Sequence, residues 1–131
     1  MRIASTASRY LLGLIFIVFG VNGLFPFLPQ PLLPTGNAWQ FHMALADSHY
    51  FLFVYALQLL AGILLLAGRF VPLALTLLAA ILTNILLFHL TMEPKGIVPG
   101  LVASLLWILT FLRFRESFRP LFRSRSEPMN D

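Results

Sequence analysis

The chain has 131 residues, of which 59% are apolar and only 11% are charged, and its formal net charge is +4. Soluble domains average about 45–50% apolar and about 25% charged residues, so the composition excludes an ordinary soluble domain and indicates one integral membrane domain, residues 1–131. The absence of cysteine excludes disulfides, thiolate metal sites and dithiol redox chemistry. The basic residues flank apolar segments, which favours lipid headgroups over nucleic acid as their partner.

The first predicted membrane helix covers residues 10–28, after a short N-terminus that carries Arg2 and Arg9. A basic start before an apolar run also fits a signal peptide, but an asparagine and several prolines follow in place of a small-residue cleavage site. We therefore expect this segment to be retained as a membrane helix. Gly13 and Gly20 are seven residues apart, so they share a face that suits close packing against another helix.

A long connection, residues 29–46, precedes the second span. Its first half is rich in proline, whereas residues 38–47 are predicted to form a short amphipathic helix at the membrane surface, anchored by Trp39 and Phe41. The remaining apolar runs predict three spans, over residues 50–67, 70–92 and 98–114. The predicted fold is all-α: a transmembrane four-helix bundle with a short interfacial segment between its first and second helices.

The basic residues predict the orientation of the chain. Eight of the nine lie near the termini or in the turn between the second and third predicted spans, and Lys95 alone lies on the other side. Because positive residues concentrate on the cytoplasmic side, both termini are predicted to be cytoplasmic. The basic tail, residues 115–131, has apolar residues at helical spacing and is expected to lie on anionic headgroups; docking of a cytosolic partner is the alternative. The eight are Arg2, Arg9, Arg69, Arg113, Arg115, Arg119, Arg123 and Arg125.

Each predicted span contains one polar residue at a similar depth in the outer half of the membrane. At a rise of about 1.5 Å per residue, these residues lie roughly 10–12 Å below the outer edge. They are Asn22, Gln58, Asn84 and Ser104. Two interpretations are open: an interhelical hydrogen-bond cluster that fixes the packing of the bundle, or a pocket for the polar head of an apolar ligand.

Ionisable residues lie above this layer, near the outer surface. His89 and Glu93 are four residues apart and share a helix face, while His42, Asp47 and His49 come from the connection before the second span. No spacing typical of metal ligands is present, so we expect no metal site. His89 is predicted to donate a hydrogen bond to a quinone-like head, with Glu93 orienting its imidazole; a histidine that only bonds at the membrane boundary is the alternative. The candidate ligand-binding residues are Asn22, Gln58, Asn84, His89, Glu93 and Ser104.

Three segments carry a family resemblance: RYLLGLIFIVFGVNGL, LQLLAGILLLAGRFVPLAL and NILLFHLTMEP. In this order and spacing they resemble the DoxX-like family of small four-helix integral membrane proteins, over residues 9–122. Relatives include DoxD, of thiosulfate:quinone oxidoreductase. The resemblance implies a four-helix bundle in the bacterial inner membrane. Many members carry a carboxylate where this chain has Gln58, so a proton-transfer role at that position does not carry over.

The resemblance and the polar layer together suggest a membrane component of a redox or quinone-linked system. We expect a lipophilic ligand, a quinone being the expected cofactor, to bind in the outer half of the bundle, and a protein partner in a redox complex. The alternative is a non-catalytic membrane accessory protein that stabilises or assembles a partner. A small-solute carrier is a third interpretation, but four spans without an ionisable group at the midplane offer little for coupling.

Overall fold

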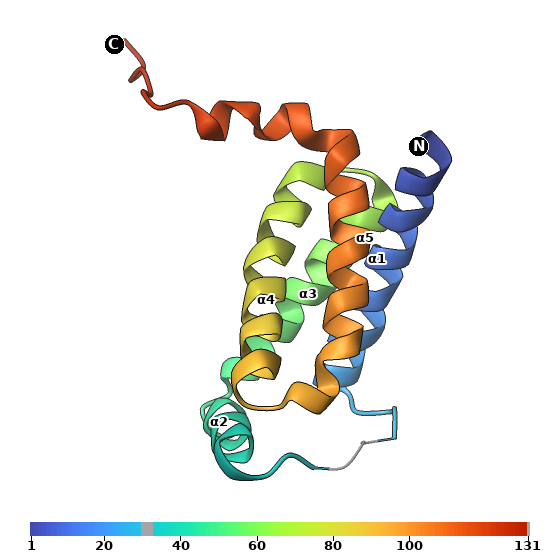
Figure 1. The fold of residues 1–131 in the computed structure, drawn as a ribbon, viewed down its shortest axis with the longest axis vertical. Helices are drawn as coiled ribbons and strands as arrows, with labels where there is room; N and C mark the ends of the chain where they lie inside the picture. The colour runs from blue at the N-terminus through green and yellow to red at the C-terminus, as the bar shows by residue number, and fades with distance from the viewer. Residues whose placement is uncertain (30–32, 131) are drawn as a thin grey trace.

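Four long α-helices form the body of the protein. The computed structural model describes residues 1–29 and 33–130, and these residues form helices and loops without a β-strand (Figure 1). The long helices are α1 (Arg2–Leu24), α3 (Tyr50–Ala67), α4 (Val71–Thr91) and α5 (Ile97–Phe114). Each of them, α5 together with the 3-10 turns at its ends, is long and apolar enough to cross a membrane. The predicted transmembrane four-helix bundle is therefore confirmed, and the protein is a multi-pass membrane protein.

The first helix begins and ends earlier than predicted. The sequence suggests a span over residues 10–28, whereas α1 starts at Arg2 and ends at Leu24. Its first turns hold no helix breaker, and their serine hydroxyls bond within the helix, as Ser8 does to the carbonyl of Ala4 at 2.7 Å. The helix ends because Phe25 precedes a proline and adopts a non-helical conformation (φ −134°, ψ 87°). The other three spans match the prediction to within one residue at either end.

Short elements connect the long helices. Helix α2 (Gly36–Asp47) occupies the place predicted for the interfacial segment and lies beyond the end of the bundle opposite the termini (Figure 1). A tight turn joins α3 to α4, with Gly68 (φ 68°) and Phe70 (φ 53°) in the left-handed region. The 3-10 turn η1 (Pro94–Gly96) joins α4 to α5. These connections place the polar positions of the four spans in the α2-side half of the bundle.

Helices α1 and α3 approach so closely that their backbones touch. A Cβ atom added at Gly62 would lie 2.8 Å from the carbonyl oxygen of Gly13. A Cβ atom added at Gly20 would lie 3.0 Å from the backbone nitrogen of Leu59. The predicted close approach at Gly13 and Gly20 is therefore confirmed, and this contact leaves room for glycine alone.

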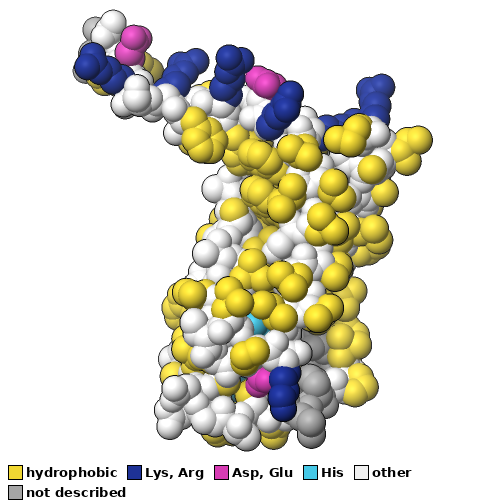
Figure 2. All heavy atoms as spheres, viewed as in Figure 1, with side chains coloured by type: hydrophobic (Ala, Val, Ile, Leu, Met, Phe, Trp, Pro, Cys, Tyr) yellow, Lys and Arg dark blue, Asp and Glu magenta, His cyan; other side chains and the backbone are white. Residues whose placement is uncertain are grey.

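Apolar side chains fill the bundle and also cover its outside. Leu65 and Leu75 are fully buried, while Leu60 and Leu101 point outward from the same bundle and are exposed. Figure 2 shows hydrophobic side chains over much of the visible face of the bundle. Soluble proteins rarely expose such a continuous apolar surface, so these outward faces fit contact with lipid. Within the bundle, the indole Nε1–H of Trp107 donates to the carbonyl of Leu75 at 2.9 Å and ties α5 to α4.

Both termini lie at the end of the bundle remote from α2 (Figure 1). Two arginines form hydrogen bonds between the helices at this end. Arg9, from α1, donates through Nη1 to the carbonyl of Leu65 near the end of α3, and Arg113, from α5, donates to the hydroxyl of Thr6 in α1. Arginine suits this position because its donors can satisfy carbonyls that a helix end leaves without partners.

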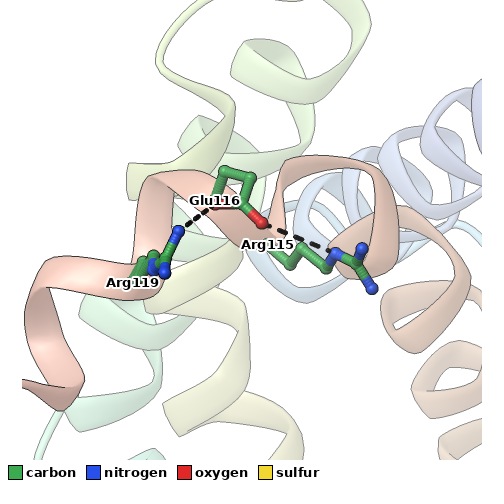
Figure 3. A network of polar contacts seen from close by, with 3 residues as sticks. All are labelled: Arg115, Glu116 and Arg119. Atoms are coloured by element: carbon green, nitrogen blue, oxygen red, sulfur yellow. Dashed lines mark hydrogen bonds and ion pairs between the residues drawn. The ribbon is translucent and has the colours of Figure 1, made fainter.

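The 3-10 helix η2 (Arg115–Phe122) turns away from α5 and runs across this end of the bundle (Figure 1). Phe118 is buried, and its ring lies 5.0 Å from that of Phe111 in α5. Basic side chains line the outer edge of this end, with hydrophobic side chains beneath them (Figure 2). Glu116 lies between Arg115 and Arg119, at 3.8 Å and 3.5 Å (Figure 3). These ion pairs are exposed and stabilise the fold little, so buried Phe118 is the main anchor of η2.

Candidate functional site

A cavity of about 370 Å³ lies among α1, α3, α4 and α5, in the half of the bundle nearer to α2. Its walls are mainly apolar and include Phe16 and Phe19 from α1, Leu82 and Ile85 from α4, and Pro99 from α5. Four residues with polar side chains also line it: Asn22, Tyr55, Gln58 and His89. The cavity thus combines an apolar surface with a few convergent polar groups, the usual make-up of a small-molecule site.

Gln58 is the most deeply placed polar group of the cavity. Its side chain comes from α3, is only 7% exposed, and forms no hydrogen bond with another residue in the described part of the chain. Since no fully enclosed polar side-chain atom of the described residues lacks a partner, the Gln58 amide must reach the cavity space. An amide that faces this space without a protein partner can bond a water molecule or a ligand group that enters the cavity.

His89 has one ring nitrogen already engaged. Its Nδ1 lies 2.9 Å from the backbone carbonyl oxygen of Glu93. A carbonyl only accepts, so Nδ1 carries the hydrogen and donates, and Nε2 of the neutral ring is an acceptor. The ring also packs against Gly96, where an added Cβ would lie 2.6 Å from Cε1, and edge-on against Phe88 at 5.1 Å. The predicted orienting role of Glu93 is therefore met by its main chain and not by its carboxylate.

Asn22 lines the cavity from the end of α1 and also shapes the chain that follows. Its Oδ1 accepts from the backbone nitrogens of Phe27 at 3.0 Å and of Leu28 at 2.8 Å. These two bonds hold the chain where it leaves α1, as asparagine commonly does at turns. The amide NH₂ group of Asn22 is the part that remains for a ligand.

The other predicted site residues lie elsewhere. Asn84 is exposed and donates to the carbonyl of Ala80 in its own helix at 2.9 Å. Ser104 is half-buried and donates to the carbonyl of Gly100 at 2.7 Å. Neither lines the cavity, nor does Glu93. The prediction that all four polar residues form one interior layer is therefore wrong for Asn84, because its amide finds a partner one turn back and needs no second helix.

Tyr55 is a cavity residue that the sequence analysis missed. It lies three residues before Gln58 and therefore on nearly the same face of α3, a spacing that could have identified it. Its ring stacks on Phe51 at 5.3 Å, and Phe51 contacts His42 of α2 at 5.1 Å. A second contact runs from Phe41 of α2 to Phe88 at 5.6 Å. Aromatic contacts thus connect α2 with two sides of the cavity.

The other histidines expected near the outer surface, His42 and His49, do not line the cavity. His42 stacks on Trp39 with ring centroids 5.9 Å apart, and His49 lies near the carbonyl of Ala46 at 3.5 Å, at the junction of α2 and α3. Across residues 1–29 and 33–130, no three histidine, aspartate or glutamate side chains lie close enough together to hold a metal ion. His89 is thus the single histidine that reaches the cavity in this part of the chain.

Comparisons with family models, with curated proteins and with solved structures find no match for this chain.

Proposed function

We propose that this is a DoxX-like protein of the bacterial inner membrane that binds a lipophilic ligand with a small, uncharged polar head in the cavity, as a component of a redox or quinone-linked system. The Gln58 amide, which faces a mainly apolar cavity and has no partner among the described residues, carries the proposal. An unpaired amide at such a place is costly unless a ligand or water completes it. The resemblance of residues 9–122 to DoxX-like proteins supports the redox setting.

The lining of the cavity favours a neutral head group. None of the cavity-lining residues in the described part of the chain is a lysine, arginine, aspartate or glutamate. A charged head buried there would have no counter-charge, and the cost of its desolvation would exceed what a few amides repay. Asn22, Gln58 and His89 instead offer neutral donors and acceptors, which match hydroxyl and carbonyl groups.

The size and the walls of the cavity favour a ring with an apolar tail. A volume of about 370 Å³ is sufficient for a substituted six-membered ring. Phe16, Phe19 and Tyr55 offer aromatic surfaces against which such a ring can pack. An isoprenoid or alkyl tail would remain in the surrounding lipid. A quinone-type cofactor combines these features, and it is the ligand class we propose.

Binding of a short-tailed quinone analogue to the purified protein in lipid nanodiscs tests this proposal. Gln58→Leu removes the buried amide and should weaken binding about 2- to 10-fold, the usual value of one hydrogen bond. Asn84→Leu is the matched control, because it removes an exposed amide that lies outside the cavity. Equal weakening in both variants, or no binding by the parent protein, would reject the proposal and leave the role of a membrane accessory or assembly protein.

We also propose that the end of the bundle with both termini is cytoplasmic and that η2 lies on anionic lipid headgroups. Eight arginines lie near the two termini or in the α3–α4 turn, which are on the same side of the bundle, whereas Lys95 lies in the α4–α5 turn on the opposite side. Positive residues favour the cytoplasmic side and its anionic lipids. The course of η2 across the bundle end, with Leu121 and Phe122 exposed, suits a segment that rests on the membrane surface.

A further inference from the structure

His89 donates from Nδ1 to a backbone carbonyl, so its Nε2 is left as a hydrogen-bond acceptor, and this restricts the ligand class further. We propose that the head group in the cavity presents a hydroxyl that donates to Nε2 of His89, so that the site prefers a lipophilic hydroquinone or phenol to the corresponding quinone. The inference rests on the proposed function, since it concerns the ligand of the same cavity. It reverses the sequence-based expectation that His89 donates to a quinone carbonyl.

The turn after α4 fixes which ring nitrogen of His89 carries the hydrogen. The carbonyl oxygen of Glu93 accepts from Nδ1 of His89 at 2.9 Å and from the backbone nitrogen of Gly96 at 3.2 Å. The second bond belongs to the 3-10 turn Pro94–Gly96, so the carbonyl is held by the backbone. The ring cannot turn freely, because it lies against the Gly96 backbone and the edge of Phe88. In the neutral ring, the nitrogen left for a ligand is therefore an acceptor.

An acceptor at this place discriminates between the two redox forms of a quinone. A quinone carbonyl has lone pairs and no hydrogen, so it would face the lone pair of Nε2 without a bond. A hydroxyl donates to Nε2 and can at the same time accept from the amide NH₂ of Gln58. Gln58 alone does not discriminate, because its amide serves as donor or acceptor according to what it meets. His89 therefore determines the preference for the hydroxyl form, and Gln58 supplies a second hydrogen bond to the same head group.

The aromatic walls favour a phenolic hydroxyl over that of an aliphatic lipid alcohol. Phe16, Phe19 and Tyr55 line the same cavity as His89 and Gln58. Aromatic rings pack on one another in offset or edge-on arrangements that add to simple burial of apolar area. A phenol presents a ring and a hydroxyl donor together, which matches both parts of the lining.

Binding measurements on the full chain in nanodiscs at pH 8, without oxygen, test the inference. The probes are decylubiquinol, its oxidised form decylubiquinone, which has nearly the same size but lacks the donors, and the dimethyl ether of the quinol, which replaces both donors with bulkier methoxy groups. We expect the quinol to bind at least about tenfold more tightly than either other probe. For a two-electron couple, a tenfold preference raises the potential of the bound pair by about 30 mV. Equal affinity for quinol and quinone would overturn the inference and leave the proposed function intact, whereas no binding of any probe would reject both.

Two variants assign the preference to a residue. His89→Gln replaces the fixed acceptor with an amide that can also donate, so we expect binding of both redox forms with a preference of less than about threefold. His42→Gln is the control, because it makes the same change at a histidine that does not line the cavity; it should keep the preference of the parent protein. A tenfold preference that persists in His89→Gln would show that another group selects the hydroxyl, and would overturn the assignment to His89.

Discussion

The carbonyl oxygen of Glu93 lies 2.9 Å from Nδ1 of His89, so the backbone of the α4–α5 turn orients the imidazole. Because the contact uses the main chain, Glu93→Gln should leave ligand binding within about twofold of the parent. Gly96→Ala places a methyl group 2.6 Å from Cε1 of His89 and must displace the ring. We expect that variant to weaken binding about tenfold or more, the effect of about 1–3 kcal/mol of overpacking.

Titration of both variants with the same quinol probe measures the difference. Thermal unfolding in the absence of ligand is the control, since it separates a displaced ring from a misfolded turn. A loss of affinity in Glu93→Gln as large as that in Gly96→Ala would mean that the carboxylate of Glu93, and not its carbonyl, governs His89.

Gln58 should lower the stability of the empty protein while it strengthens ligand binding. Its side chain is 7% exposed and has no partner among the residues of the described ranges, so water in the cavity offsets only part of the free energy of burying it until a ligand enters. Gln58→Leu is similar in size and removes this cost. We expect an unchanged or higher unfolding temperature without ligand and a smaller rise when ligand is added. A clear fall in the unfolding temperature of the ligand-free variant would contradict this expectation, because it would show that the Gln58 amide stabilises the fold through a hydrogen bond.

Hydropathy alone predicts the four spans well but says little about which side of each helix faces inward. In membrane helices, the outward face is as apolar as the inward one, so the amphipathic pattern that orients helices of soluble proteins is weak. Depth follows from the rise per residue, and this is why Gln58 and His89 were placed in the correct half of the bundle. Asn84 has a similar depth, yet its exposed side chain lies off the face that Leu82, Ile85 and His89 turn to the cavity.

Local chemistry explains the other differences between sequence and structure. The end of α1 could have been predicted from Pro26, because the residue before a proline avoids the helical region. The hydrogen bond between His89 and the carbonyl of Glu93 could not have been predicted from the sequence, since it depends on the course of the 3-10 turn and not on residue types. Gly23, Gly96 and Gly100 also line the cavity, and side chains of Tyr55, His89 and Ile85 pack against them, so its shape requires all four helices in place.

The contact of α1 with α3 should be sensitive to a single methyl group. In Gly62→Ala, the new Cβ would lie 2.8 Å from the carbonyl oxygen of Gly13, a backbone atom that cannot move without shifting a helix. We expect a loss of about 1–3 kcal/mol, measured by unfolding in mild detergent. Gly100→Ala is the control, because its Cβ would meet only the side chains of Ile85 and Leu86, at 3.2 Å and 3.3 Å, which can adjust. Equal stability of the two variants would contradict the backbone contact.

Topology reporters test the proposed orientation. Fusions at Pro34, Arg69, Lys95 and the C-terminus should report outside, inside, outside and inside, in that order. The expectation follows from four spans and from the excess of arginine at the end with the termini. A cytoplasmic signal at Lys95 would contradict both the orientation and the placement of the cavity in the outer half of the membrane.

The contact of η2 with anionic lipid can be measured directly, because the chain has no cysteine and a single one can be introduced for labelling. Phe122 is 81% exposed at the end of η2, so an environment-sensitive fluorophore on Phe122→Cys should report an apolar surrounding when η2 rests on the membrane. We expect a larger blue shift in nanodiscs with anionic lipid than in neutral ones, and a smaller shift at high salt, which screens the arginines. The same label on Ser126→Cys, beyond η2, is the control and should shift less. Equal emission from Phe122→Cys in both lipids would rule out an electrostatic contact and favour a cytosolic partner at this surface.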